Sequence, residues 1–294
     1  MFSARFAKGM SIILALATAS AASAQISQEL DFETRPEPVT VAHGGVEVTV
    51  QPSKPDEYGS ITTTLALRAP GVQSAIMQVG DDARSGYSRW IGFAKLNASD
   101  PLPSVLFESF SGGAHCCATL YAIVPYAGRF KLVEFAGIDG DISKRLPTDL
   151  DGDGWVDFLR QDDSFRYQFS SGAGSYSPPA IFNIYKGQLI DVSVEPGFRP
   201  VWERFAAQTL NACSNKSDED RNGACAAYVA AGARLGRYEA AMKQASALAN
   251  PSAHLPQFCQ VTVTAEGCPS GKELTFYTFQ SALSHFLREN GYIN

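Results

Sequence analysis

Four aspartates recur within one short stretch of the sequence, at Asp149, Asp151, Asp153 and Asp157. Near a protein surface, like charges a few ångströms apart repel each other by about 1 to 4 kcal/mol per pair. A hard divalent cation relieves this repulsion, and calcium takes carboxylate and backbone carbonyl oxygens as ligands. The sequence therefore predicts calcium as the cofactor, bound by these four side chains and the backbone carbonyl of Trp155. A solvated acidic turn is the alternative interpretation.

The tripeptide His115-Cys116-Cys117 is the second cluster that could do chemistry. A thiolate pair beside an imidazole could hold zinc or copper. Oxidation is the competing outcome, because an exported chain with an even number of cysteines usually pairs them. The tripeptide is therefore a second candidate metal site, a disulfide or a redox-active thiol pair.

The other four cysteines fall into two local pairs. Cys213 and Cys225 lie in neighbouring predicted helical segments, and Cys259 and Cys268 bracket a short loop. Both pairs can close as local disulfides, which would leave the two adjacent cysteines of the tripeptide to each other. Sequence spacing does not exclude crossing pairings.

A hydrolytic site would need a nucleophile, a base and an orienting group. The candidate bases are His43, His115, His254 and His285, and no Gly-x-Ser-x-Gly motif accompanies them. A glycosidase carboxylate pair stays open, because the 30 acidic residues offer many candidates. The sequence therefore assigns no catalytic residue, and we expect a protein that is not an enzyme.

Three tyrosines are the candidates for a recognition surface. Tyr167, Tyr176 and Tyr185 could form an aromatic face for a sugar or a peptide. Alternating aromatic residues in strands are more often core or cross-strand pairs. If the three tyrosines do form such a face, the predicted partner is an unidentified protein or carbohydrate ligand.

The N-terminal residues predict export. Arg5 and Lys8 precede an apolar run, and the pattern Ala-Ser-Ala that ends at Ala24 is typical of signal-peptide cleavage. Loss of residues 1–24 removes these two basic residues and changes the formal charge from −6 to −8. Such a charge argues against a nucleic-acid partner. We expect a periplasmic or secreted protein, and no later run is long enough to predict a membrane span.

The elements expected to position these residues begin with strands. Residues 25–60 predict an extended arm with one strand, because only Val46 to Val50 alternate apolar and polar side chains. Residues 61–197 predict an antiparallel all-β domain, propeller-like or sandwich-like, because short β-branched and aromatic runs alternate with turn residues. The predicted strands are 62–68, 74–79, 90–96, 105–109, 119–124, 130–135, 155–159, 165–169, 181–185 and 189–194.

Residues 198–294 predict a small helical domain stapled by disulfides, which gives the chain a segregated α+β class. One helix is expected at 201–213, a second after the acidic residues 217–220, and a third that ends near Asn250. In the last helix, apolar residues recur at helical spacing from Phe276 to Leu287, and Gly291 follows the end. This apolar stripe predicts core packing.

The stretch from Asp149 to Asp157 resembles the Asp-x-Asp-Gly-Asp-Gly-x-x-Asp loop of FG-GAP and VCBS-type β-repeat proteins. An EF-hand matches less well, because Arg160 replaces the bidentate Glu and the predicted flanks are strands. The element Ser-Gly-Gly-Ala-His-Cys-Cys at 111–117 is similar to one in secreted bacterial proteins with this loop. Asp139-Gly140-Asp141 resembles half of a second loop. The resemblance implies calcium binding and export, and it implies no activity.

These observations lead to three hypotheses. The first is an exported, calcium-binding, non-enzymatic protein that acts in recognition or envelope maintenance. The second is an envelope hydrolase whose site lies between the two domains. The third is a thiol oxidoreductase that uses Cys116 and Cys117. A deep cleft with converging acid, base and backbone donors would favour the hydrolase, whereas surface aromatic residues would favour recognition.

Overall fold

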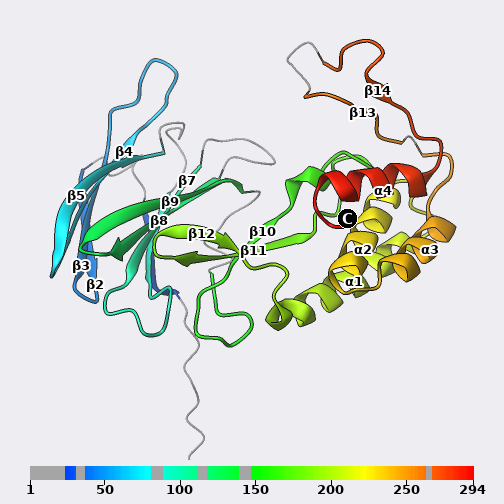
Figure 1. Cartoon of the computed structure of the whole chain (residues 1–294). Coiled ribbons are helices and arrows are strands. Elements are labelled where there is room, and N and C mark those ends of the chain that lie inside the picture. The colour runs from blue at the N-terminus through cyan, green and yellow to red at the C-terminus, as the bar shows by residue number, and fades with distance from the viewer. Residues whose placement is uncertain are drawn as a thin grey trace, which may run out of the picture.

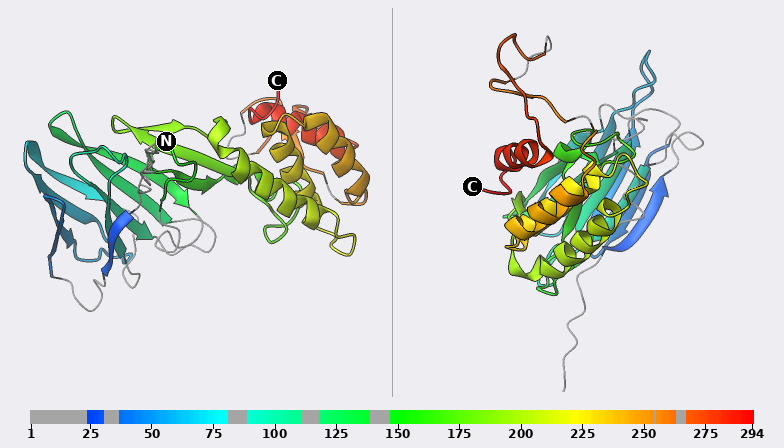
Figure 2. Two further views of the ribbon diagram at one scale, coloured as in Figure 1. Left: turned by 90° about the horizontal axis from the view of Figure 1, so that it is seen from below. Right: turned by 90° about the vertical axis from the view of Figure 1, so that its right-hand side faces the viewer.

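A computed structural model describes the chain over residues 24–30, 37–80, 89–110, 118–138, 147–253, 255–262 and 267–294. Within these ranges, antiparallel sheets form the N-terminal part and four helices form the C-terminal part (Figure 1). No sheet of the described residues closes into a barrel. The segregated arrangement of strands and helices that the sequence predicts is confirmed. Figure 2 shows the two parts at opposite ends of an elongated molecule.

Two larger sheets pack face to face. The four-stranded sheet has the order β2-β3-β4-β5, and the five-stranded sheet has the order β1-β6-β7-β8-β9. The strands of the first are Val39–His43, Val46–Pro52, Thr63–Ala69 and Val72–Val79. The strands of the second are Ala24–Leu30, Arg89–Ala94, Ser104–Phe110, Ala118–Tyr126 and Arg129–Ile138. Alternate side chains of β3, among them Val46 and Val48, are fully buried between the two sheets.

A small third sheet covers the other face of the five-stranded sheet. Its strands are β10 (Phe158–Gln161), β11 (Pro179–Tyr185) and β12 (Gln188–Asp191). Phe158 stacks on Phe135 of β9 with ring centroids 4.8 Å apart. Along β11, Ile184 faces this core whereas Ile181 packs into the helical core. The third sheet therefore lies between the five-stranded sheet and the helices, and β7 and β8 are almost wholly buried because both of their faces are covered.

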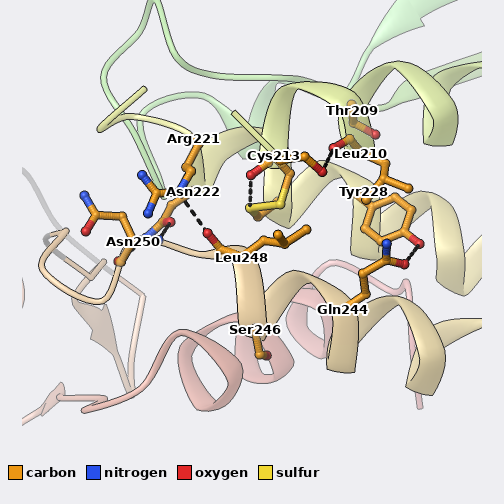
Figure 3. Close-up of a disulfide and its surroundings, with 12 residues drawn as sticks. Thr209, Leu210, Cys213, Arg221, Asn222, Tyr228, Gln244, Ser246, Leu248 and Asn250 are labelled. Atoms are coloured by element: carbon orange, nitrogen blue, oxygen red, sulfur yellow. Dashed lines mark hydrogen bonds between the residues drawn. A yellow bond between two sulfur atoms is a disulfide. The ribbon is translucent and has the colours of Figure 1, made fainter. Parts of the chain in front are cut away.

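The helices are α1 (Arg199–Cys213), α2 (Asn222–Arg234), α3 (Tyr238–Leu248) and α4 (Phe279–Glu289). The predicted disulfides Cys213–Cys225 and Cys259–Cys268 are both present. The first joins α1 to α2 inside the core (Figure 3). The second closes an arm that carries the short strands β13 (Phe258–Cys259) and β14 (Glu273–Leu274).

Buried polar contacts bind the start of α2 to the end of α3. The Asn222 side chain accepts a hydrogen bond from Asn250 N at 2.7 Å and donates one to Asn250 O at 3.1 Å. Arg221 Nε donates to Leu248 O at 2.8 Å, and Figure 3 shows these side chains beside the disulfide. Partly buried backbone groups at the end of α3 thereby find partners, which isolated helix ends lack.

Two expectations about elements are wrong. Residues 25–60 contain β1 and β2 in addition to the predicted strand, because the turn at Gly44-Gly45 lets β2 pair with β3 and β1 pairs with β6. The predicted strand 165–169 is a 3₁₀ turn, Asp163–Phe165, followed by irregular chain. Phe165 and Phe169 instead both insert into the helical core, where each ring contacts Phe286.

The last predicted helix begins at Phe279, so Phe276 precedes it, and Gly291 follows its end with φ of 69°. Among the described residues, no helix combines the length and the apolar character that crossing a membrane requires. Several predicted features lie outside the described residues: the signal peptide up to residue 23, the segment 111–117 with His115, Cys116 and Cys117, the segment 139–141, and His254.

Candidate metal centre and the cleft beside it

The acidic loop lies directly before β10 and is closed at its base by an antiparallel bridge. Asp157 N donates to Thr148 O at 2.9 Å. Gly152 and Gly154 have φ of 85° and 91°, a conformation that side chains disfavour and glycine allows. The two glycines therefore let the chain bend within the loop and return to pair at Asp157 with Thr148.

Three of the predicted ligands converge. Asp149, Asp151 and Asp153 each offer one carboxylate oxygen, and these oxygens lie within 4.8 Å of one another. Backbone donors hold the side chains in place: Asp149 accepts from Gly152 N at 2.7 Å and from Gly154 N at 3.0 Å. Asp153 accepts from Trp155 N at 2.8 Å.

The converging carboxylates repel one another. Burial raises the pKa of Asp151, and the negative charges of Asp153 and Asp149 raise that pKa further. A hydrogen bond from the backbone of Asp153 opposes this effect. The loop therefore holds excess negative charge at the place where its oxygens meet, which fits a hard cation with oxygen ligands.

Asp157 is not a member of this converging group. Its side chain is only 2% exposed. One oxygen accepts from Leu150 N at 2.6 Å, and the other accepts from Asn183 Nδ2 at 2.7 Å. Burial raises the pKa of Asp157 to about 6, although both hydrogen bonds lower it. In this arrangement Asp157 braces the loop against β11.

The loop also touches the beginning of the helical part. A Cβ atom added to Gly197, in the 3₁₀ turn that precedes α1, would lie 2.1 Å from Asp151 Oδ2. Real Cβ atoms do not approach oxygen so closely, so only glycine fits at this position. The candidate metal loop and the first turn of the helical part are therefore in direct contact.

A cleft of about 580 Å³ lies beside the loop, between turns of different sheets. Trp155 of the loop lines it together with Tyr126, Tyr185, Asp100 and Lys186. The rings of Trp155 and Tyr185 meet edge to face with centroids 5.7 Å apart. The backbone of Trp155 forms a bridge with Asn97, which places the loop along one wall.

The tyrosines predicted to share a recognition face do not lie together. Tyr185 lines the cleft, whereas Tyr176 packs against the helical core. Tyr167 is 61% exposed and its ring lies over Gly172. Only Tyr185 lies on β11, whereas Tyr167 and Tyr176 lie in the irregular chain before that strand, so their regular spacing in the sequence does not place them on one face.

The described histidines occupy packing positions. His285 lies against Phe258 and Phe276, with ring centroids 4.9 and 5.1 Å away. His43 lies 5.8 Å from the ring of Phe93. Neither residue lines the cleft.

Sequence reasoning missed the cleft itself. Its polar and aromatic residues come from four distant turns, so no local pattern unites them. The one available signal is that Trp155, a large aromatic residue, interrupts an otherwise acidic and glycine-rich loop.

Comparison with known proteins relates the helical part to one family. Residues 202–291 match the model of the sll0997 C-terminal domain. The chain is 34% identical over 149 residues to the probable thylakoid lumen protein sll0997 of Synechocystis sp., which covers 49% of this chain and 43% of that protein. It is 26% identical over 261 residues to the protein y4bJ of Sinorhizobium fredii, which covers 87% of this chain and 41% of that protein.

The chain thus spans about two fifths of the length of these relatives. No solved structure matches the chain.

Proposed function

We propose that this protein is an exported calcium-binding protein that acts in recognition or envelope maintenance. The observation that carries the proposal is the convergence of three carboxylate oxygens within 4.8 Å in a glycine-bent loop. The order of Asp and Gly residues in FG-GAP and VCBS-type loops supports the same reading. Export is supported by the N-terminal sequence and by similarity to a relative named as a probable thylakoid lumen protein.

The proposed role of calcium is structural. The ion would take oxygens from Asp149, Asp151 and Asp153, while the Trp155 carbonyl and solvent complete the six to eight ligands that calcium prefers. Asp157 would become a further ligand of the ion if one of its oxygens left its hydrogen bond to Leu150 N or Asn183 Nδ2. Otherwise Asp157 would keep both hydrogen bonds and brace the loop. In either case the ion offsets two of the negative charges of the loop and fixes the loop between β10 and α1.

The cleft favours recognition over hydrolysis as the accompanying activity. In the described part of the chain, Asp100 is the one carboxylate that lines it, whereas glycosidases use a pair. The aromatic side chains that line the cleft are those of Tyr126, Trp155 and Tyr185. The thiol pair proposed as a redox centre lies outside the described residues, and no observation favours it over the calcium-binding proposal.

Calorimetric titration of metal-free protein with calcium chloride tests the proposal. We expect a dissociation constant of about 10⁻⁴ to 10⁻³ M, as in other extracellular modules. Asp153→Asn keeps the acceptor for Trp155 N but removes the charge, so it should weaken calcium binding roughly tenfold. Asp163→Asn is the matched control, because Asp163 is an exposed acidic residue outside the loop that pairs with Arg166.

Thermal melting provides the second readout. Calcium at about 10 to 100 times its dissociation constant should stabilise the wild type by about 1.4 to 2.7 kcal/mol, and chelator should remove this gain. A wild-type protein that takes up no calcium and melts identically with calcium and with chelator contradicts the proposal. Equal calcium binding by wild type and Asp153→Asn would exclude this loop as the site.

A further inference from the structure

The cleft beside the acidic loop has a rigid frame. Three of the turns that line it belong to different sheets, and hydrogen bonds link the regions around them. Gln73 N, next to the β4–β5 turn, donates to Gly128 O of the β8–β9 turn at 2.8 Å. Lys131 Nζ donates to Lys186 O of the β11–β12 turn at 3.0 Å. The cleft is therefore held open by contacts between its walls, as a preformed binding site is.

Its lining is amphipathic and nearly balanced in charge. The rings of Tyr126, Trp155 and Tyr185 provide flat apolar surface with polar edges. Among the residues that the structure describes, the charged groups lining the cleft are one carboxylate, Asp100, and one ammonium, Lys186. Asp100 accepts from Asn97 N through one oxygen at 2.9 Å, so its position is fixed by the backbone.

Lysines also hold the two tyrosine rings in place. Lys131 Nζ lies 4.7 Å from the ring centroid of Tyr126, and Lys186 Nζ lies 4.7 Å from that of Tyr185. Such cation–π contacts stabilise the ring orientations at an exposed site. The aromatic walls are thus positioned before a ligand arrives.

This combination selects a ligand class. A flat ligand with apolar C–H faces and hydroxyl groups at its rim would stack on the aromatic rings and bond with the carboxylate and the ammonium. A strongly anionic or cationic ligand would meet one unfavourable charge. A volume of about 580 Å³ lies within the range of small-molecule sites and suits a few sugar rings.

The cleft shares a wall with the acidic loop. Trp155 belongs to that loop, and Ala98 N donates to Gly154 O at 2.9 Å. Asn97 pairs with Trp155 and bonds to Asp100. A cation that fixes the loop therefore also fixes two of the groups that would contact a ligand.

We propose that this cleft binds a neutral oligosaccharide and that calcium in the adjoining loop orders its Trp155 wall. The second half of this inference rests on the proposed calcium site, whereas the first half stands on the cleft alone. The sugar would stack against Trp155 and Tyr185 and bond to Asp100 and Lys186.

Tryptophan fluorescence gives a direct test. Of the three tryptophans, Trp90 and Trp202 are 5% and 3% exposed, so a ligand-dependent change reports Trp155. The probes are cellotriose, maltotriose and triacetylchitotriose, with decaproline as a peptide of extended conformation. Each is titrated at up to millimolar concentration with calcium and with chelator, and calcium uptake is measured on the same samples.

We expect at least one trisaccharide to change the fluorescence, with affinity reduced roughly tenfold in Tyr185→Ala and in Tyr126→Ala. Calcium uptake by both variants should equal that of the wild type, because neither residue belongs to the loop. Tyr277→Ala, which removes an 89% exposed ring outside the cleft, is the matched control and should bind normally. Chelator should weaken sugar binding.

Three results separate this inference from the proposed function. Calcium uptake with no response to any trisaccharide overturns the saccharide site and leaves the calcium site intact. A sugar response that is equal with calcium and chelator, in protein that takes up no calcium, supports the saccharide site and overturns the calcium proposal. A response to decaproline alone overturns the saccharide assignment in favour of a peptide site.

Discussion

Asp157 differs from the other acidic residues of the loop in its surroundings. Asp149, Asp151 and Asp153 are held by backbone donors of the loop itself; Asp149 and Asp151 are half-buried and Asp153 is exposed. Asp157 is buried and bonds to Leu150 N and Asn183 Nδ2. The aspartates of this loop therefore have two roles. Three of them bring carboxylate oxygens together where a cation could bind, and Asp157 attaches the loop to β11.

The buried carboxyl should give the metal-free protein an unusual pH dependence. The pKa of Asp157 is about 6 in the folded protein, against about 3.9 in an unfolded chain. The folded state therefore binds the proton more tightly, so the free energy of unfolding should fall as pH rises from about 4 to about 6. Urea denaturation in calcium-free buffer across this window measures the effect.

Asp157→Asn is the control for this dependence, because it cannot ionise. The free energy of unfolding of this variant should be lower overall. The side-chain NH₂ of the new asparagine must face one of two N–H donors, Leu150 N or Asn183 Nδ2, and cannot accept a hydrogen bond from it. The component of the pH dependence between about 4 and 6 should nevertheless disappear. An identical fall in both proteins would assign the dependence to other groups.

The sequence was sufficient to predict that the aspartates cluster, because their alternation with glycine is local. It could not separate Asp157 from the rest, because its partner Asn183 lies on another strand. The same limit hid the cleft, whose Asp100, Tyr126 and Lys186 meet only when three turns are brought together. Local spacing predicts local geometry, whereas cross-strand contacts depend on register.

The two described disulfides differ in burial. Cys213 and Cys225 are fully buried and join α1 to α2 in the helical core. Cys259 and Cys268 close an arm of two short strands whose cysteines are only partly buried. The arm projects from the helices in Figure 1.

Removing each disulfide should therefore have unequal effects. Cys213→Ala with Cys225→Ala should lower the free energy of unfolding by about 3 kcal/mol, as expected for a loop of this size and a buried site. Cys259→Ala with Cys268→Ala should cost less than about 1 kcal/mol, because the arm can open locally. Denaturant melts of the two variants check this order, and equal losses would contradict it.

Helices were easier to predict than strands near the boundary between the two parts. The spacing of Phe279, Leu283 and Phe286 predicted α4, because helical periodicity needs no distant partner. Phe165 and Phe169 suggested a strand by composition, yet they anchor an irregular segment to the helices. Their partners in α4 lie more than 100 residues away, beyond the reach of any local pattern.

The contact between Asp151 and Gly197 connects the strand-rich part to the helical part. Gly197→Ala would place a methyl carbon against Asp151, so the loop or the turn before α1 must move. We expect a loss of about 1 to 3 kcal/mol, the usual cost of overpacking, together with weaker calcium binding.

A double-mutant cycle checks the cause. On an Asp151→Gly background the same substitution meets no side chain, so its cost should be clearly smaller. Equal costs on both backgrounds, measured by denaturant melts, would show that the effect arises within the turn itself.

At the largest scale, composition predicted the order of a strand-rich and a helical part, but not how the sheets stack. The segment 25–60 looked like an arm because prolines interrupt it and one run alternates. Its strands β1 and β2 gain their structure from partners, since β1 pairs with β6 across about 60 to 70 residues.

The strand β11 serves two hydrophobic cores at once, with Ile181 on one side and Ile184 on the other. Because side chains alternate along a strand, inserting or deleting a single residue here would exchange the occupants of both cores. We therefore expect single-residue insertions to be tolerated only in the turns on either side of β11, one of which borders the cleft.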